Sequence, residues 1–141
     1  MSIKAIMKKL NLIFAILLFT LSCAGANAQT SATAAANRAW PAFWREFSAA
    51  VKNRDRVALR KMMPDDFFDG GGGSTPDEWL KFIDENAANG SWRDLQRSVA
   101  GGAVVTTRWG KAKPTRITRD KAYYFEFRSG RKWYFAGVVG D

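Results

Sequence analysis

Residues 122–139 read AYYFEFRSGRKWYFAGVV and decide the architecture that the sequence predicts. Aromatic and polar side chains alternate on both sides of SGR, which is typical of a β-hairpin with a bulged three-residue loop. In that register one strand face carries Tyr123, Phe125, Phe127, Trp133 and Phe135. The opposite face carries Tyr124, Glu126, Arg128 and Tyr134. Nothing in the sequence decides which of these two faces is buried.

The sequence before the hairpin predicts two more strands and four helices. Residues 103–109 and 115–119, AVVTTRW and TRITR, continue the two-residue period of strands. Further upstream the hydrophobic period becomes about 3.6 residues, which indicates helices. The first helix should begin near Asn37 and bury Trp40, Phe43, Trp44 and Phe47, and the later helices should cover residues 55–63, 76–87 and 92–99.

Several helix ends carry recognisable signals. Pro41 suits the first turn of the first helix, and Asp55 suits the N-cap of the second helix, which Pro64 ends. Thr75 and Glu78 have the spacing of a capping box at the start of the third helix. We expect the buried side of that helix to consist of Trp79, Phe82 and Ile83.

Helices that precede an antiparallel meander indicate an α+β domain, with N-terminal helices packed on one face of a curved antiparallel sheet. The segments FWREFSAAVKNRDRVALRKMM, DDFF and FEFRSGRKWYFAGVVGD resemble exported members of the nuclear-transport-factor-like superfamily, which includes ketosteroid-isomerase-like and SnoaL-like proteins. The resemblance spans about residues 39–141 and implies a cone-shaped α+β barrel with a pocket between helices and sheet. The enzymes of the superfamily usually rely on Asp, Tyr and often His in that pocket, and this chain has no histidine.

The N-terminus predicts export. A basic start, an apolar run and the small-x-small site Ala26-Asn27-Ala28 are typical of a signal peptide over residues 1–28. Residues 29–36 then form a short tether, and residues 37–141 a single domain, which we expect in the periplasm or secreted. A lipoprotein anchored through Cys23 is the alternative. Removal of Lys4, Lys8 and Lys9 lowers the formal net charge from +9 to +6.

The composition excludes several reaction classes. Without histidine, and with Cys23 removed by processing, the domain has no Ser-His-Asp or Cys-His nucleophile and no zinc site built from nitrogen and sulfur ligands. Carboxylate, tyrosine, lysine and arginine chemistry is left. We expect no cofactor and no catalytic metal.

The four glycines 70–73 lie in the segment DDFFDGGGGSTPDE. A phosphate loop is rejected because the segment has no lysine and places Asp77 and Glu78 where a phosphate would lie. A calcium site is disfavoured because Phe67 occupies the third ligand position of an EF-hand loop. We expect a flexible connection, and the alternative is a lid in which Phe67 and Phe68 insert into the mouth of the pocket.

The candidate ligand-binding residues are Trp40, Trp44, Phe67, Phe68, Tyr124, Glu126 and Tyr134. The tryptophans are expected mainly to pack in the core. Glu126 beside tyrosines would suit proton abstraction if that face lined a pocket. The competing interpretation is an outward face on which Glu126 pairs with Arg128 or Arg131.

A basic run lies in the second half of the domain, before the terminal hairpin, and consists of Arg108, Lys111, Lys113, Arg116, Arg119 and Lys121. We interpret it as a solvated segment with weak, salt-sensitive attraction to anionic surfaces such as lipid headgroups. Export makes nucleic acid an unsuitable partner. A homodimer is left open.

Two functions are consistent with these observations. The first is an exported, non-catalytic domain that binds a small apolar ligand or an envelope component. The second is an isomerase- or dehydratase-like enzyme that uses Glu126 or Asp66 as a base and a tyrosine as hydrogen-bond donor. A carboxylate in a closed apolar pocket would favour the enzyme, and a filled core would favour the binding protein.

Overall fold

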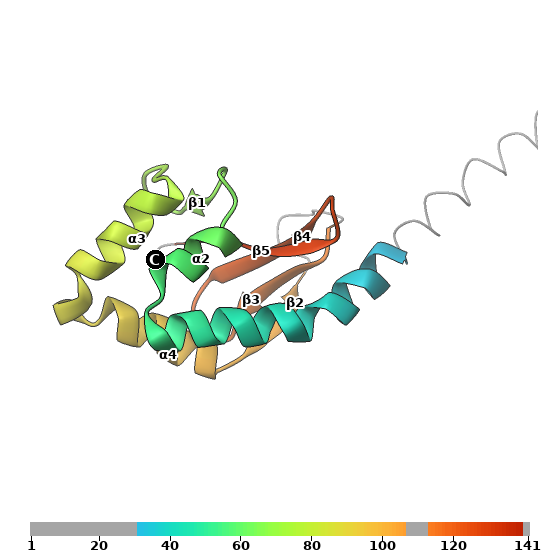
Figure 1. The fold of residues 1–141 in the computed structure, drawn as a ribbon, viewed down its shortest axis with the longest axis horizontal. Coiled ribbons are helices and arrows are strands. Elements are labelled where there is room, and N and C mark those ends of the chain that lie inside the picture. The colour runs from blue at the N-terminus through green and yellow to red at the C-terminus, as the bar shows by residue number, and fades with distance from the viewer. Residues whose placement is uncertain (1–30, 107–112, 140–141) are drawn as a thin grey trace, which may run out of the picture. The chain divides into compact units, whose positions relative to one another are not determined.

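The computed structural model describes residues 31–106 and 113–139 (Figure 1). The chain divides into two compact units, residues 1–34 and 35–141. In the first unit the described residues, 31–34, are helical. The architecture below is that of the second unit. The expected signal peptide and Cys23 lie outside the described residues.

Four α-helices form in the described residues. A long helix covers residues 31–53, and α2 (Arg56–Met62), α3 (Pro76–Glu85) and α4 (Ser91–Ala100) follow, with a 3₁₀ turn at Ala87–Asn89. Two expected caps are confirmed: Asp55 accepts a hydrogen bond from the Ala58 N–H, and Thr75 forms a capping box with Glu78. At α4 the N-cap is Gly90, at φ 96°.

The start of the domain differs from the expected tether. Residues 31–36 are already helical, and Ala36 is fully buried. The indole N–H of Trp133 donates to the Ala36 carbonyl at 2.8 Å, which fixes this turn of the helix to the sheet. Pro41 therefore lies inside the long helix rather than in its first turn. A proline there lacks the N–H that the carbonyl of Asn37 would accept.

Five strands form a mixed sheet with the order β1-β5-β4-β3-β2. Their bounds are β1 Phe68–Asp69, β2 Ala103–Thr106, β3 Thr115–Thr118, β4 Tyr123–Arg128 and β5 Lys132–Val138. The predicted antiparallel meander from β2 to β5 is confirmed. The two-residue β1, which was not predicted, pairs in parallel with β5. The order ends at β1 and β2, so the sheet is open within the described residues, and the closed cone is not observed.

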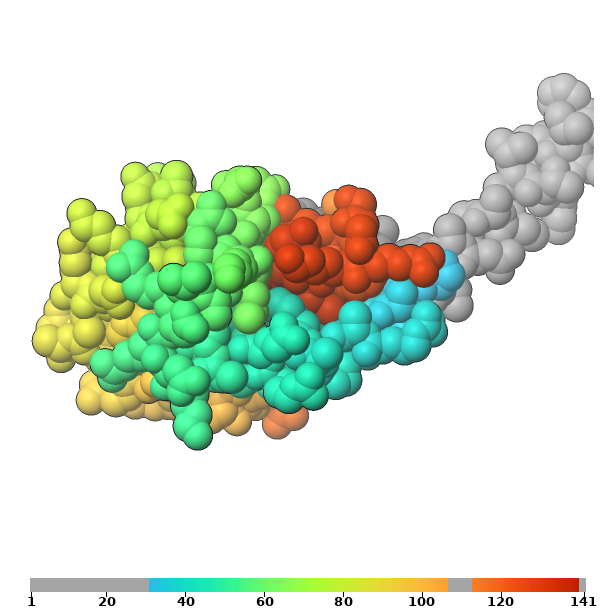
Figure 2. All heavy atoms as spheres, viewed as in Figure 1, coloured from blue at the N-terminus to red at the C-terminus, as the bar shows by residue number. Residues whose placement is uncertain are grey.

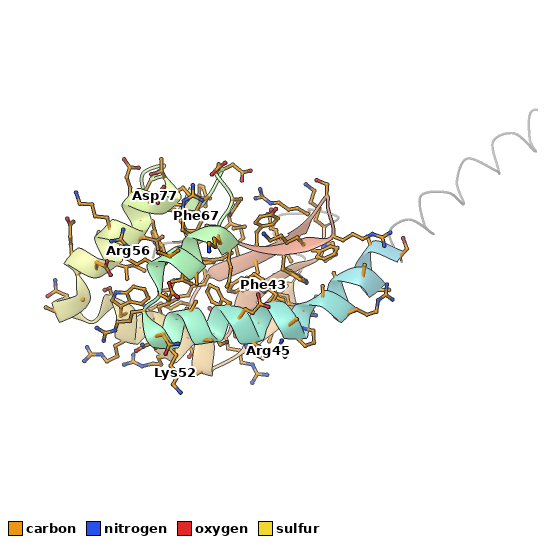
Figure 3. All side chains as sticks on the ribbon, viewed as in Figure 1. Phe43, Arg45, Lys52, Arg56, Phe67 and Asp77 are labelled. Carbon is orange, nitrogen blue, oxygen red and sulfur yellow. The ribbon has the colours of Figure 1, made fainter. Side chains whose placement is uncertain are left out.

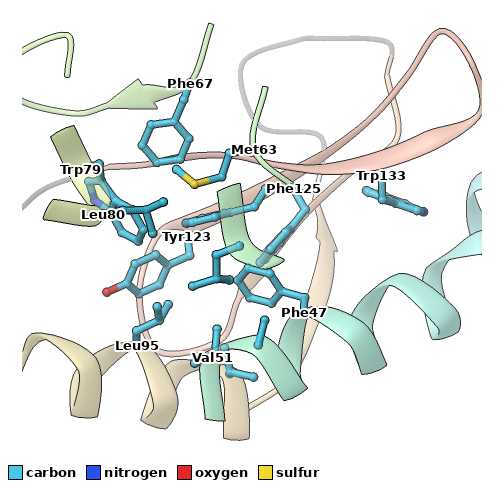
Figure 4. Packing of buried hydrophobic residues seen from close by; sticks show 14 of the residues in the cluster. Phe47, Val51, Met63, Phe67, Trp79, Leu80, Leu95, Tyr123, Phe125 and Trp133 are labelled. Atoms are coloured by element: carbon cyan, nitrogen blue, oxygen red, sulfur yellow. The ribbon is translucent and has the colours of Figure 1, made fainter. Parts of the chain in front are cut away.

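The predicted aromatic face of the hairpin is the buried one. Phe125 pairs with Phe135 and Phe127 with Trp133 across the two strands, and all four side chains are buried. The helices cover this face: Figure 4 shows Phe47, Val51 and Leu95 gathered around it. In Figure 3, Phe43 points from the long helix toward the sheet, whereas Arg45 and Lys52 point away. On the face drawn in Figure 2, the red atoms of the hairpin border the cyan atoms of the long helix.

One core expectation for α3 is wrong. The buried side of this helix consists of Trp79, Leu80 and Ile83, whereas Phe82 is 57% exposed. Trp79 contacts Phe67 and Phe135 at ring distances of 5.4 and 5.3 Å, and this contact sets the rotation of the helix. Phe82 follows Trp79 by three residues but lies outside the buried side of the helix. Leu80, one residue after Trp79, is buried instead.

The capping box of α3 gives a stability prediction. Thr75→Ala removes the side-chain oxygen that accepts from the Glu78 N–H, and we expect the free energy of unfolding to fall by about 1 kcal/mol. Equilibrium urea unfolding at neutral pH measures this loss. Lys81→Ala, at an exposed position of the same helix, is the control and should change stability by less than about 0.5 kcal/mol. Equal effects of the two substitutions would contradict the capping role.

Candidate functional site

The sheet separates the seven predicted site residues into two groups. Trp40, Trp44 and Phe67 contact the helix-covered face through Phe125 or Phe135. The opposite face of the sheet carries Tyr124, Glu126 and Tyr134, and the ring of Phe68 lies 6.5 Å from that of Tyr124. The structure therefore does not bring all seven together into one site.

The aromatic residues of the first group are largely core residues. Trp40 stacks on Trp44 at 5.1 Å, and both rings meet Phe125 edge-on at 5.6 and 5.5 Å. Phe67 is buried and contacts Phe135 at 5.3 Å. Phe67 and Phe68 thus lie on opposite sides of the sheet, which does not match a lid that inserts both rings into one opening.

The second group contains an ion-pair network centred on Arg128. Glu126 is only 6% exposed, and its Oε2 accepts a hydrogen bond from Nε of Arg128 at 3.1 Å and lies 3.1 Å from Nη2 in the ion pair. Nη1 of the same arginine donates to Asp66 Oδ1 at 2.5 Å. The expected pairing of Glu126 with Arg128 is therefore confirmed. Both carboxylates that were considered as bases already accept hydrogen bonds from this guanidinium.

The glycine segment is closed around the carboxylate of Asp69. Asp69 Oδ1 accepts from the N–H groups of Gly72 and Gly73 at 3.0 and 2.9 Å. A hydrogen bond with the Ser74 side chain, followed by the backbone donors, lowers the pKa of Asp69. The N–H of Gly70 donates to the Val138 carbonyl at 2.8 Å, so the segment is also fixed to β5. An aspartate immediately before the glycines was the sequence signal for this turn.

A third arrangement lies where the long helix crosses β3 and β5. We call it the Arg116 cluster, and it consists of Asn37, Trp40, Arg116 and Trp133. The guanidinium carbon of Arg116 lies 4.6 Å from the centre of the Trp40 ring and 5.6 Å from that of Trp133. The two indoles meet edge-on at 4.7 Å. In this geometry the electron-rich faces of the indole rings attract the positive charge of the guanidinium.

Strand register explains why Arg116 points toward the helices. Arg116 pairs with Phe125 on β4, and directly paired residues share a face of the sheet. Arg116 was expected to lie in a solvated basic segment, and for this residue that expectation is wrong. Of the other basic residues, Lys121 pairs with Asp94 at 3.6 Å, and Arg108 and Lys111 lie outside the described residues.

The guanidinium of Arg116 is incompletely satisfied. Its Nη2 donates to Asn37 Oδ1 at 2.9 Å, whereas its Nε is buried and has no hydrogen-bond partner among the described residues. Burial lowers the pKa of Arg116, and no carboxylate among the described residues counteracts that effect. The cluster can therefore offer an unused donor and a positive charge to an anionic group.

Other kinds of site are not found within residues 31–106 and 113–139. No three or more Cys, Asp or Glu side chains gather there in a way that could hold a metal ion. None of the helices in this part of the chain has both the length and the apolar composition needed to cross a membrane.

Comparisons with family models, curated proteins and solved structures gave no match to this chain.

The closed glycine turn gives a prediction about pH. Asp69→Asn keeps a side-chain oxygen but removes the charge, and we expect a loss of about 1 kcal/mol at pH 7. The pKa of Asp69 is lower in the folded chain than its ordinary value near 4. Its charge therefore stabilises the fold above about pH 4, and this contribution is lost as the pH falls through the folded pKa.

Urea unfolding of the wild type and of Asp69→Asn between pH 7 and pH 2.5 tests this prediction. The difference in stability should shrink below about pH 4. Asp65→Asn is the control, because the Asp65 side chain is 94% exposed and its pair with Arg60 should contribute little. A difference for Asp69→Asn that stays constant down to pH 2.5 would show that the charge has no role in the turn.

Proposed function

We propose that this domain binds a small ligand at the Arg116 cluster and is not a catalyst. The observation that carries the proposal is the buried Nε of Arg116, which has no acceptor while its guanidinium lies against two indoles. A buried donor without a partner costs about 1 to 3 kcal/mol. A ligand that supplies the acceptor recovers this cost on binding, so the feature is consistent with a binding site.

The enzyme alternative finds less support. A general base needs a free oxygen directed at the substrate proton. Arg128 already occupies oxygens of both Glu126 and Asp66, and these carboxylates lie on the face of the sheet opposite the tryptophans. An isomerase or dehydratase built on them would have to break this network first. Binding at the Arg116 cluster requires no such step.

The wider setting that we propose is an exported domain of the nuclear-transport-factor-like kind. Helices followed by an antiparallel meander, with the helices on one face, support that relationship. The basic start, the apolar run and Ala26-Asn27-Ala28 support export. The ligand is then a small molecule or a group of an envelope component, with weak attraction to anionic surfaces as a secondary property and no role for nucleic acid.

Nuclear magnetic resonance can test the proposed site directly. Titration of ¹⁵N-labelled protein with benzoate, benzamide, decanoate and phenol follows the N–H signals of Trp133 Nε1 and Arg116 Nε. We expect at least one of these probes to shift both signals. Shifts confined to residues near Tyr134, or no shift with any probe, would overturn the proposal.

Substitution of the two stacked tryptophans separates a binding role from a packing role. Trp40→Ala removes the ring beneath Arg116, and we expect about tenfold weaker binding of the probe. Trp44→Ala is the matched control, because Trp44 packs on Trp40 and Phe125 and should preserve binding. Trp40→Phe, with circular dichroism of all variants, covers the case in which Trp40→Ala fails to fold. Equal weakening by Trp40→Phe and Trp44→Ala would indicate packing alone.

The carboxylate network provides an independent check on the location. Glu126→Gln should leave the affinity for the probe unchanged, because Glu126 lies on the other face of the sheet. A loss of binding in this variant would favour a site near Tyr124 and Tyr134 instead.

A further inference from the structure

We infer that the ligand of the Arg116 cluster carries a single carboxylate, which replaces the Asn37 side chain on one edge of the guanidinium. This inference rests on the proposed function, since it names the chemical class of ligand for the same site. Four observations support it: the geometry of that edge, the behaviour of a second arginine in the same sheet, the exposed surroundings of Asn37, and the charge of the cluster.

The edge of Arg116 formed by Nε and Nη2 has two parallel donors and only one acceptor. In a guanidinium these two N–H groups point in the same direction, with a spacing that matches the two oxygens of a carboxylate. Asn37 supplies one neutral oxygen to Nη2 at 2.9 Å and leaves Nε without a partner. A carboxylate in the same place would satisfy both donors.

Arg128 shows what this edge does when a carboxylate is within reach. Its Nε donates to Glu126 Oε2 at 3.1 Å, and its Nη2 lies 3.1 Å from the same oxygen in an ion pair. The two arginines belong to neighbouring strands of one sheet and lie on its opposite faces. Arg116 differs in having an amide where Arg128 has a carboxylate.

The surroundings of Asn37 allow a ligand to take its place. Asn37 is exposed on the long helix, so its side chain can turn into water with little loss of packing. Val105 pairs with Arg116 in the β2–β3 register and is 67% exposed, which places an exposed apolar residue on the strand next to Arg116. A ligand whose carboxylate binds Arg116 could extend an apolar body toward this strand.

The charge of the cluster selects a monoanion. One guanidinium and one carboxylate form a neutral pair, which is the arrangement that a partly buried site tolerates. A phosphate dianion would leave one negative charge that the single guanidinium does not neutralise. The structure thus assigns the site to an apolar carboxylate rather than to a phosphate.

Three probes and one substitution test the ligand class. Benzoate should shift the Arg116 Nε–H signal and bind at least tenfold more tightly than benzamide, which has the same shape without the charge. Inorganic phosphate should leave the signal in place. Arg116→Lys should lose at least tenfold in benzoate affinity, because an ammonium group has no parallel pair of donors.

A second test needs no ligand, because Asn37→Asp places a carboxylate on the same edge from within the chain. We expect this variant to melt at a temperature a few degrees higher than the wild type, to show a shifted Arg116 Nε–H signal, and to bind benzoate at least tenfold more weakly. Asn37→Ala frees the edge and should keep benzoate binding. Asn53→Asp, an exposed position on the same helix, controls for the added charge.

The outcomes separate the two proposals. If benzamide binds at the cluster as tightly as benzoate, the carboxylate assignment fails and the binding site stands. If Asn37→Asp changes neither the melting temperature nor the Nε–H signal beyond the Asn53→Asp control, the edge geometry is wrong. If none of the probes perturbs the cluster, the proposed function itself fails.

Discussion

The cross-strand pair Phe125 and Phe135 is the contact on which the other elements depend. The two rings lie 5.5 Å apart on neighbouring strands, and the rest of the domain packs around them. Phe47 of the long helix reaches both rings, at 5.0 and 5.2 Å. On the same face of the sheet, the rings of Phe67 and of Trp79 from α3 each lie 5.3 Å from that of Phe135. A one-residue slip of the hairpin would turn both rings to the opposite face and leave the helices without a surface to cover.

Local signals explain why much of this arrangement is predictable from the sequence. The alternation around SGR sorted the side chains of the hairpin into an aromatic face and a mixed face, and the Thr75–Glu78 spacing located the start of α3. Both signals lie within a few residues of the feature that they predict. The fold class follows from them, because helices that precede a meander have only a sheet face to cover.

The features that could not be predicted from the sequence depend on contacts between distant parts of the chain. Ala36 is buried in the core and its carbonyl accepts from Trp133, and β1 forms because Phe68 and Asp69 pair with β5. Phe82 is exposed because Trp79 fixes the rotation of α3 against Phe135. Arg116 is the clearest case for the site: a charged residue in a basic run was expected in water, yet its guanidinium lies against two indoles. No local pattern distinguishes that arginine from its solvated neighbours.

The hydrogen bond between Trp133 and Ala36 joins residues that are 97 positions apart. The aromatic side of the long helix therefore has no partner surface until the last two strands of the chain have been synthesised. Contacts of such long range slow folding, since a large loop must close before they form. A domain whose long helix gains its partner surface only from the C-terminal hairpin is expected to fold after its synthesis is complete rather than during it.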